Sequence, residues 1–302
     1  MAHKAAGMSA PLAIPTARLR EYYELTKPRV VLLLVFTAVI GMFLATPGAV
    51  PWTVLIGGGL GIWLCSASAA VLNQWADREA DARMARTRRR PLPTGSVSDA
   101  EAIGLAVVLG LVGAALLLVL TNALTMWLTL ASLVGYAVIY TLYLKRLTPQ
   151  NIVIGGAAGA APPVLGWAAV TGELHPHSLI LFLIIFAWTP PHFWALAIDR
   201  KDEYARAGIP MLPVTHGVRY TSLQILLYTA ILFAISLLPF AAKMSSWLYL
   251  IGAVPLGLIY LAAAWKLATR PTPGLPAWLF SYSIVYLMLL FGLLLIDHYF
   301  VV

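Results

Sequence analysis

The chain contains few charged residues. Asp, Glu, Lys and Arg together make up 11% of its 302 residues, whereas a soluble domain carries about 25%. Hydrophobic residues make up 61% of the sequence, and the mean hydropathy is +0.85. This shortage excludes an ordinary soluble globular domain and indicates an integral membrane protein.

The chain also lacks thiols and strand-like alternation. Cys65 is the single cysteine, so no disulfide can form within the chain and we expect no redox role. None of the long apolar runs alternates polar and apolar residues, as the strands of a membrane barrel do. The remaining possibility is an all-α membrane protein.

Nine apolar runs have the length of about 17–22 residues that a helix needs to cross a bilayer. We predict nine transmembrane helices in one bundle, around a central cavity that opens to the cytoplasmic side. Short connections give no sign of a domain boundary. The runs are 30–46, 53–73, 101–120, 124–143, 151–170, 178–198, 221–241, 246–266 and 276–297.

The basic residues indicate the orientation. With nine spans, 19 of the 20 Lys and Arg residues lie on the side of the N-terminus, and only Lys243 lies on the other side. The positive-inside rule therefore predicts a cytoplasmic N-terminus and an external C-terminus in the inner membrane. Residues 1–25 have no apolar run, so we expect a cytoplasmic tail followed by a single membrane domain, 26–302. Anionic headgroups account for the net charge of +8 without nucleic acid.

A first acidic segment lies at the cytoplasmic end of the second run. Asn73, Asp77 and Asp81 follow one another at intervals of four residues, so on a helix they share one face. Like charges at this spacing repel, and near a membrane each carboxylate also loses hydration. A divalent cation bound through oxygen atoms would offset that cost.

A second acidic segment, 199–204, follows the sixth run. It contains Asp199, Asp202 and Glu203, and a proline-rich stretch follows it as one follows the first segment. Asp81 precedes Pro91 by ten residues, as Glu203 precedes Pro213. Both segments are expected on the cytoplasmic side, so they can converge on one cavity as a weak internal duplication.

Carboxylates and guanidinium groups are mixed in these segments. Mg²⁺ favours one or two carboxylates together with phosphate oxygens, and guanidinium groups bind anions. At the surface of an apolar cavity, this combination favours ionisation of an allylic diphosphate that carries a long hydrocarbon. A simpler interpretation is that the acidic residues only pair with neighbouring arginines and that the run 86–90 only anchors the inner surface.

These residues resemble the intramembrane prenyltransferases of the UbiA superfamily. The matching pattern is Asn73-x-x-x-Asp77-x-x-x-Asp81 followed by Arg86-Thr87-Arg88-x-Arg90-Pro91-Leu92-Pro93-x-Gly95, with Leu25-Thr26-Lys27-Pro28-Arg29 before the first run. The resemblance implies a nine-helix bundle, Mg²⁺ held by Asp77, Asp81 and Asp202, and catalysis by these residues with Lys201. It also implies substrate contacts from Asn73, Arg78, Arg88, Arg90, His192, Asp199, Glu203, Tyr204 and His216.

The segment 188–214 resembles the branch of the superfamily that farnesylates haem. It reads Trp188-Thr189-Pro190-Pro191-His192-Phe193-Trp194 and continues through Lys201-Asp202 to Pro213. Ring-prenylating relatives have a clean Asp-x-x-x-Asp here, whereas this chain has Asp199-x-x-Asp202-Glu203. The resemblance implies transfer of farnesyl from farnesyl diphosphate to a vinyl group of haem b, with water addition, to give haem O. Haem A synthase or terminal-oxidase assembly proteins are the partners it implies.

His192 is the first candidate for an axial ligand to the haem iron. It could equally bond the carbonyl groups that Pro190 and Pro191 leave free. His216 is a candidate contact for the haem propionates, and His175 and His177 are expected in a solvated outer loop. Two other functions stay open: prenylation of an aromatic acid or quinone precursor, and a transporter that uses Asp77, Asp81 and Asp202 as a cation or proton path.

Overall fold

The computed structural model describes residues 16–300, except the side chain of Arg146, and this part of the chain is helical with no strand. The elements are α1 (Thr16–Leu25), α2 (Pro28–Leu44), α3 (Trp52–Ala82), α4 (Pro91–Thr94), α5 (Asp99–Leu120), α6 (Ala123–Val134), η1 (Gly135–Leu144), α7 (Lys145–Leu147), α8 (Asn151–Ala160), α9 (Pro162–Thr171), α10 (Pro176–Asp199), α11 (Lys201–Arg206), α12 (Leu212–Thr215), α13 (Gly217–Ser236), α14 (Leu238–Ala241), α15 (Trp247–Thr269) and α16 (Leu275–Phe300).

Eight segments of the described chain are long and apolar enough to cross a membrane. The 17 residues of α2 reach that standard only together with α1, from which α2 is bent by 53°. The prediction of an all-α membrane protein is confirmed, with eight spans or nine when the bent pair is counted. Residues 1–15 of the predicted tail lie outside the described residues, and the rest of it forms α1.

The spans Asn151–Thr171 and Ala123–Leu144 depart from regular α-helix. α8 ends at Ala160 and α9 begins at Pro162, because proline has no amide hydrogen to continue the ladder. Residues Gly135–Leu144, at the end of the fourth apolar run, form the π-helix η1. Extended π-helix is rare and is found mostly at functional sites.

Close packing of α2 against α9 holds the first half of the bundle together. A Cβ atom at Gly166 would overlap the carbonyl oxygen of Ala38, and one at Gly41 would overlap that of Pro163. These two glycines therefore let the two backbones meet, as small residues do at helix contacts in membranes.

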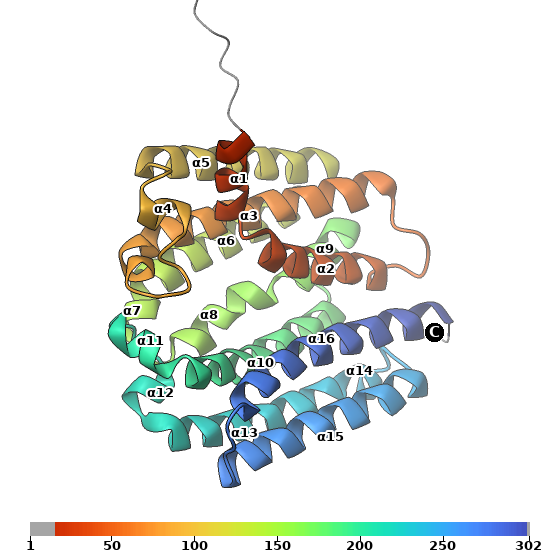
Figure 1. Cartoon of the computed structure of the whole chain (residues 1–302). Coiled ribbons are helices and arrows are strands. Elements are labelled where there is room, and N and C mark those ends of the chain that lie inside the picture. The colour runs from red at the N-terminus through yellow and green to blue at the C-terminus, as the bar shows by residue number, and fades with distance from the viewer. Residues whose placement is uncertain (1–15, 301–302) are drawn as a thin grey trace, which may run out of the picture.

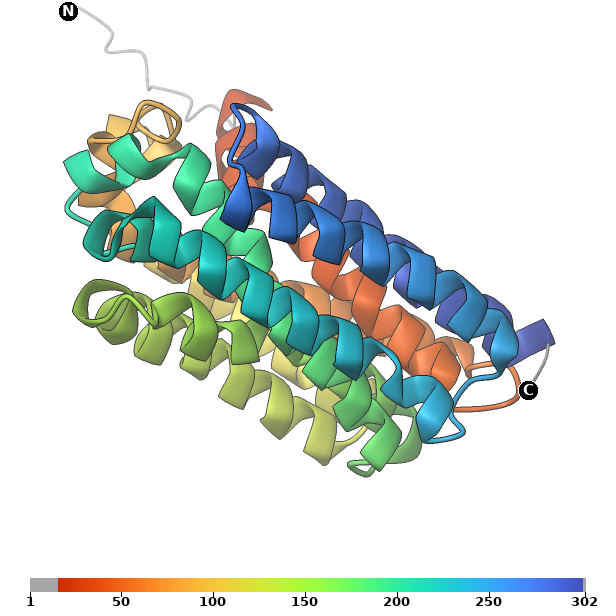
Figure 2. The ribbon, with the colours of Figure 1, turned by 90° about the horizontal axis from the view of Figure 1, so that it is seen from below.

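The short helices of the two long connections gather at one end of the bundle. Both views show α4, α11 and α12 at that end, with the C-terminus and the connection from α2 to α3 at the other (Figures 1 and 2). Met84 of the first connection belongs to the same hydrophobic core as Ala207, Ile209 and Met211 of the second. The predicted convergence of the two acidic segments on one end of the bundle therefore holds.

Replacing Gly166 with Ala is expected to lower the melting temperature of the detergent-solubilised protein by several degrees, because the added methyl group forces α2 and α9 apart. The matched control is Gly159→Ala on α8, where a Cβ atom meets nothing within 4 Å. Thermal unfolding followed by size-exclusion chromatography measures both variants. Equal melting temperatures for the two would contradict this account of the packing.

Candidate active site

The first acidic segment lies inside α3. This helix continues to Ala82, beyond the end of its apolar run, so that Asn73, Asp77 and Asp81 point to the interior of the bundle. Their exposed fractions are 4%, 5% and 6%. The prediction that the three residues share one helical face is confirmed, and both carboxylates are buried.

Each buried carboxylate has a cationic partner from elsewhere in the chain. Lys145 Nζ lies 2.5 Å from Asp77 Oδ2, and Arg90 Nη1 lies 2.7 Å from Asp81 Oδ2. Thr87 Oγ1 donates a hydrogen bond of 2.9 Å to the carbonyl oxygen of Asp81, which fixes the connection that carries Arg90. A buried charge is tolerated only when it is paired, and these two cations provide the pairing.

Asn73 connects three elements. Its Nδ2 atom donates to Asp77 Oδ2 and to Thr141 Oγ1 of η1, each at 3.1 Å. Its Oδ1 atom accepts a hydrogen bond from the ammonium group of Lys27, which lies ahead of α2. The positive charges of Arg90 and Lys145 act on this ammonium group. The site is therefore crowded with cations.

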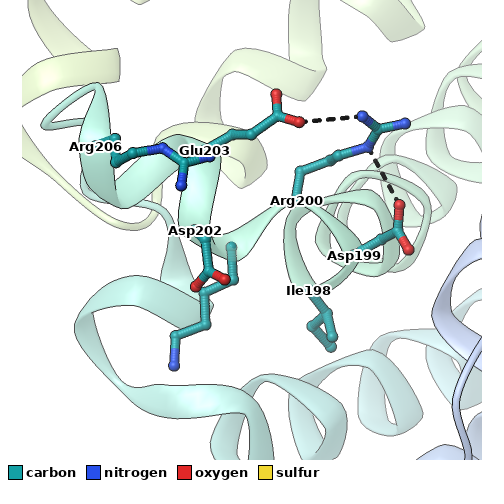
Figure 3. Close-up of a pocket in the computed structure, with 7 residues that line it drawn as sticks. Ile198, Asp199, Arg200, Asp202, Glu203 and Arg206 are labelled. Atoms are coloured by element: carbon teal, nitrogen blue, oxygen red, sulfur yellow. Dashed lines mark hydrogen bonds and ion pairs between the residues drawn. The ribbon is translucent and has the colours of Figure 1, made fainter. Parts of the chain in front are cut away.

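The second acidic segment begins where α10 ends. Figure 3 shows the Arg200 side chain between Asp199 and Glu203, with nitrogen–oxygen distances of 3.2 Å to both carboxylates. Asp202 points away from this cluster (Figure 3). These residues line an open pocket of about 430 Å³ together with Ile198, Lys201 and Arg206.

Tyr204 connects the two segments. Burial raises its pKa, the positive charge of Arg86 opposes that shift, and the negative charges of Glu203 and Asp77 add to it. Asp77 and Arg86 belong to the first segment, so Tyr204 of α11 lies within electrostatic range of it.

The donor set at α3 is suited to a hard cation such as Mg²⁺, which prefers carboxylate oxygens. In both ion pairs the carboxylate oxygen is Oδ2 of the aspartate. Among residues 16–300 with a described side chain, none donates a hydrogen bond to Oδ1 of Asp77 or Asp81. No three His, Cys, Asp or Glu side chains in that range are grouped as metal ligands. The assignment of Asp77, Asp81 and Asp202 to one ion stays a prediction.

Three predicted substrate contacts lie away from this cluster. Arg78 forms an ion pair of 3.2 Å with Asp99 at the start of α5 and donates to the carbonyl of Trp75. Arg88 is exposed. His216 lies beside the ring of Tyr220, with 5.3 Å between the ring centroids. Of the arginines expected at the substrate, the structure brings Arg90 to the acidic row and places Arg78 against α5.

His192 is buried in α10 against α16. Its ring stacks on Trp188 and on Phe280, and its Nδ1 atom lies 2.6 Å from Ser283 Oγ. The Ser283 hydroxyl donates to the carbonyl of Phe280, so it accepts from Nδ1–H of His192. In the neutral ring, Nε2 then carries the lone pair. A histidine in this form can ligate a metal through Nε2 while its Nδ1–H donates a hydrogen bond to a second group.

The sequence reasoning missed Lys27 and Lys145. Both stand at ends of apolar runs that the sequence predicts to be cytoplasmic, where the positive-inside rule already accounts for a basic residue. The available signal was Lys27 within the Leu25-Thr26-Lys27-Pro28-Arg29 pattern, and no comparable signal marked Lys145. Their contacts with Asn73 and Asp77 depend on chain segments that are 46 and 68 residues apart in sequence.

Comparison with known proteins gives consistent matches. The model of the UbiA prenyltransferase family matches residues 34–295. Protoheme IX farnesyltransferase 1 of Pseudomonas putida KT2440 is 60% identical over 292 residues, which cover 97% of this chain and 98% of the relative. Protoheme IX farnesyltransferase of Saccharophagus degradans is 61% identical over 282 residues, which cover 93% of this chain and 92% of the relative.

Solved structures share the fold at low identity. A structure of digeranylgeranylglyceryl phosphate synthase superposes with a TM-score of 0.79 at 18% identity, covering 94% of this chain and 99% of that one. A UbiA homologue from Archaeoglobus fulgidus, solved with GPP and Mg²⁺ bound, has a TM-score of 0.59 at 16% identity, covering 91% and 99% of the two chains. These likenesses establish the helical fold.

Arg90 and Arg78 provide a direct test of the site. Because Arg90 lies on the acidic row, Arg90→Ala is expected to weaken the binding of inorganic diphosphate with Mg²⁺ by about tenfold or more, the loss of a hydrogen bond to a charged group. Arg78→Ala is expected to change binding by less than about twofold. Isothermal titration calorimetry on the purified protein measures both, and an equal loss in the two variants would refute this arrangement.

Proposed function

The chain belongs to the UbiA prenyltransferase family, and from that premise we propose that it is a farnesyltransferase that acts on protohaem IX. It transfers the farnesyl group of farnesyl diphosphate to a vinyl group of haem b, with addition of water, and releases haem O and diphosphate. The observation that carries this assignment is the identity of 60% to protoheme IX farnesyltransferase 1 of Pseudomonas putida over nearly the whole chain.

The first step is ionisation of the farnesyl diphosphate. Lys145 and Arg90 bind the diphosphate oxygens, because both cations already lie against the acidic row, and Lys201 approaches from the second segment. Asp77, Asp81 and Asp202 hold Mg²⁺, which when bound supplies positive charge to the leaving diphosphate. Positive groups arranged in advance stabilise the charge that develops as the carbon–oxygen bond breaks.

The second step joins the two substrates. The π-electrons of a haem vinyl group attack C1 of the farnesyl cation, so this carbon–carbon bond forms without a general base. A water molecule then adds to the new carbocation and loses a proton, which leaves a hydroxyethylfarnesyl group on the ring. The rings of Tyr136 and Tyr140 in η1 stack with 5.4 Å between their centroids, and aromatic faces of this kind stabilise a cation.

The site belongs to the cytoplasmic face of the inner membrane. The end of the bundle that contains α4, α11 and α12 also contains Arg83, Arg86, Arg88 and Arg89, which the positive-inside rule assigns to the cytoplasm. Residues 1–25 then form a cytoplasmic tail on a single membrane domain, 26–302, and a central cavity opens to this side. Haem A synthase or terminal-oxidase assembly proteins receive the product.

Membranes that contain this protein, given haem b, farnesyl diphosphate and Mg²⁺, are expected to accumulate a farnesylated haem of higher mass. Asp77→Asn and Asp202→Asn should each lower the rate by at least about a hundredfold, because the developing charge loses its counter-ion. The control is Asp99→Asn, a carboxylate outside the site. Liquid chromatography with mass spectrometry follows the product. Wild-type membranes that yield no such haem beside an active control enzyme would rule out the assignment.

His192 is the candidate axial ligand through Nε2. His192→Ala is expected to weaken haem binding and shift the Soret band, while the affinity for farnesyl diphosphate stays within about twofold of wild type. The control is His298→Ala, because that ring bonds the carbonyl of Thr46 at the opposite end of the bundle. An unchanged Soret band in His192→Ala would show that this histidine serves packing alone.

A further inference from the structure

Lys27 has an unusual backbone conformation. Its φ and ψ angles are 49° and 56°, in the left-handed region, which is unfavourable for a residue with a Cβ atom. The following residue is Pro28, which further disfavours a helical conformation before it. A strained backbone at a functional site persists only when its surroundings hold it.

The ammonium group of Lys27 differs from its cationic neighbours. Lys145 is paired with Asp77, and Arg90 is paired with Asp81. Lys27 is half-buried and bonds the amide oxygen of Asn73, but it has no ion pair with any carboxylate in the described part of the chain. Two carboxylates therefore lie beside three basic side chains here, and Lys27 is the one that has no carboxylate as its direct partner.

Gln74 holds the turn that presents Lys27. Its Nε2 atom donates to the carbonyl oxygens of Glu24 at 3.2 Å and Leu25 at 2.9 Å, the last carbonyls of α1. The Glu24 carbonyl also accepts from the amide of Lys27, whereas the Leu25 carbonyl has no partner within its own helix and takes its donor from Gln74. The exposed fraction of Gln74 is 2% and that of Leu25 is 0%, so the contact is shielded from competing water.

We propose that Lys27 binds an anionic oxygen of a substrate, and that Gln74 is the positioning residue that holds it there through the end of α1. The anion is a phosphoryl oxygen of the prenyl diphosphate or a carboxylate of the acceptor. Asn73 and Gln74, adjacent in α3, have separate tasks: Asn73 orients the ammonium group and Gln74 orients the backbone. The identity of the two substrates rests on the proposed function, whereas the anion site itself does not.

The test of Lys27 uses binding and needs no turnover. Farnesyl thiolodiphosphate with Mg²⁺ is titrated by calorimetry, and haem b is titrated by its Soret absorbance. Lys27→Asn removes the charge but tolerates the left-handed backbone. It is expected to raise the Kd of one of the two ligands by about tenfold to a hundredfold, the range for a charged hydrogen bond. The Kd of Lys27→Arg should stay within about threefold of the wild-type value. The control is Lys266→Asn, because Lys266 is exposed on α15.

The ligand whose Kd rises in Lys27→Asn identifies the anion that Lys27 binds. A weaker thiolodiphosphate complex assigns Lys27 to the diphosphate, and a weaker haem complex assigns it to a propionate. Lys27 has no role as an anion ligand if neither Kd changes by more than about twofold, or if Lys27→Arg binds as poorly as Lys27→Asn. A wild-type protein that binds the thiolodiphosphate but forms no farnesylated haem would refute the proposed function and leave this result standing.

The role of Gln74 is tested by a double-mutant cycle. Gln74→Leu is expected to raise the same Kd by about fivefold in the wild-type background and by less than about twofold in Lys27→Asn, because it acts through Lys27. The control is Gln224→Leu on α13. The positioning role would be overturned if Gln74→Leu raised the Kd equally in both backgrounds, or if it lowered the melting temperature without changing the Kd.

Discussion

The burial of two carboxylates on one helical face is the constraint on which the site depends. Asp77 and Asp81 lie one turn apart on α3 and are almost inaccessible, so each needs a neutralising partner at short range. Neither partner can come from α3 itself. The rest of this end of the bundle is arranged to bring cations to this face from three other places in the chain.

Each of these cations comes with a local departure from regular structure. Lys145 follows directly after the π-helix η1, which also brings Thr141 against Asn73. Arg90 lies on a connection that Thr87 anchors to the carbonyl of Asp81. Lys27 stands in a left-handed turn at a bend of 53° between α1 and α2.

The second acidic segment differs in character from the first. Arg200 forms ion pairs with Asp199 and Glu203, whereas Asp202 is exposed and points away from these two side chains. This difference agrees with the departure of the sequence from the Asp-x-x-x-Asp pattern. A buried row on α3 and an open pocket at α11 are therefore different parts of the site.

The sequence by itself determined the membrane class, the apolar runs and the acidic row, because hydropathy and a spacing of four residues are local properties of the chain. It also indicated that the two long connections share one end of the bundle. It could not separate Arg90 from Arg78, since both lie in the pattern that runs from Asn73 to Gly95 and only the packing of α5 draws Arg78 to Asp99. Nor could it show that Lys27 and Lys145 face Asn73 and Asp77. Those contacts join residues far apart in sequence, and only tertiary packing brings them together.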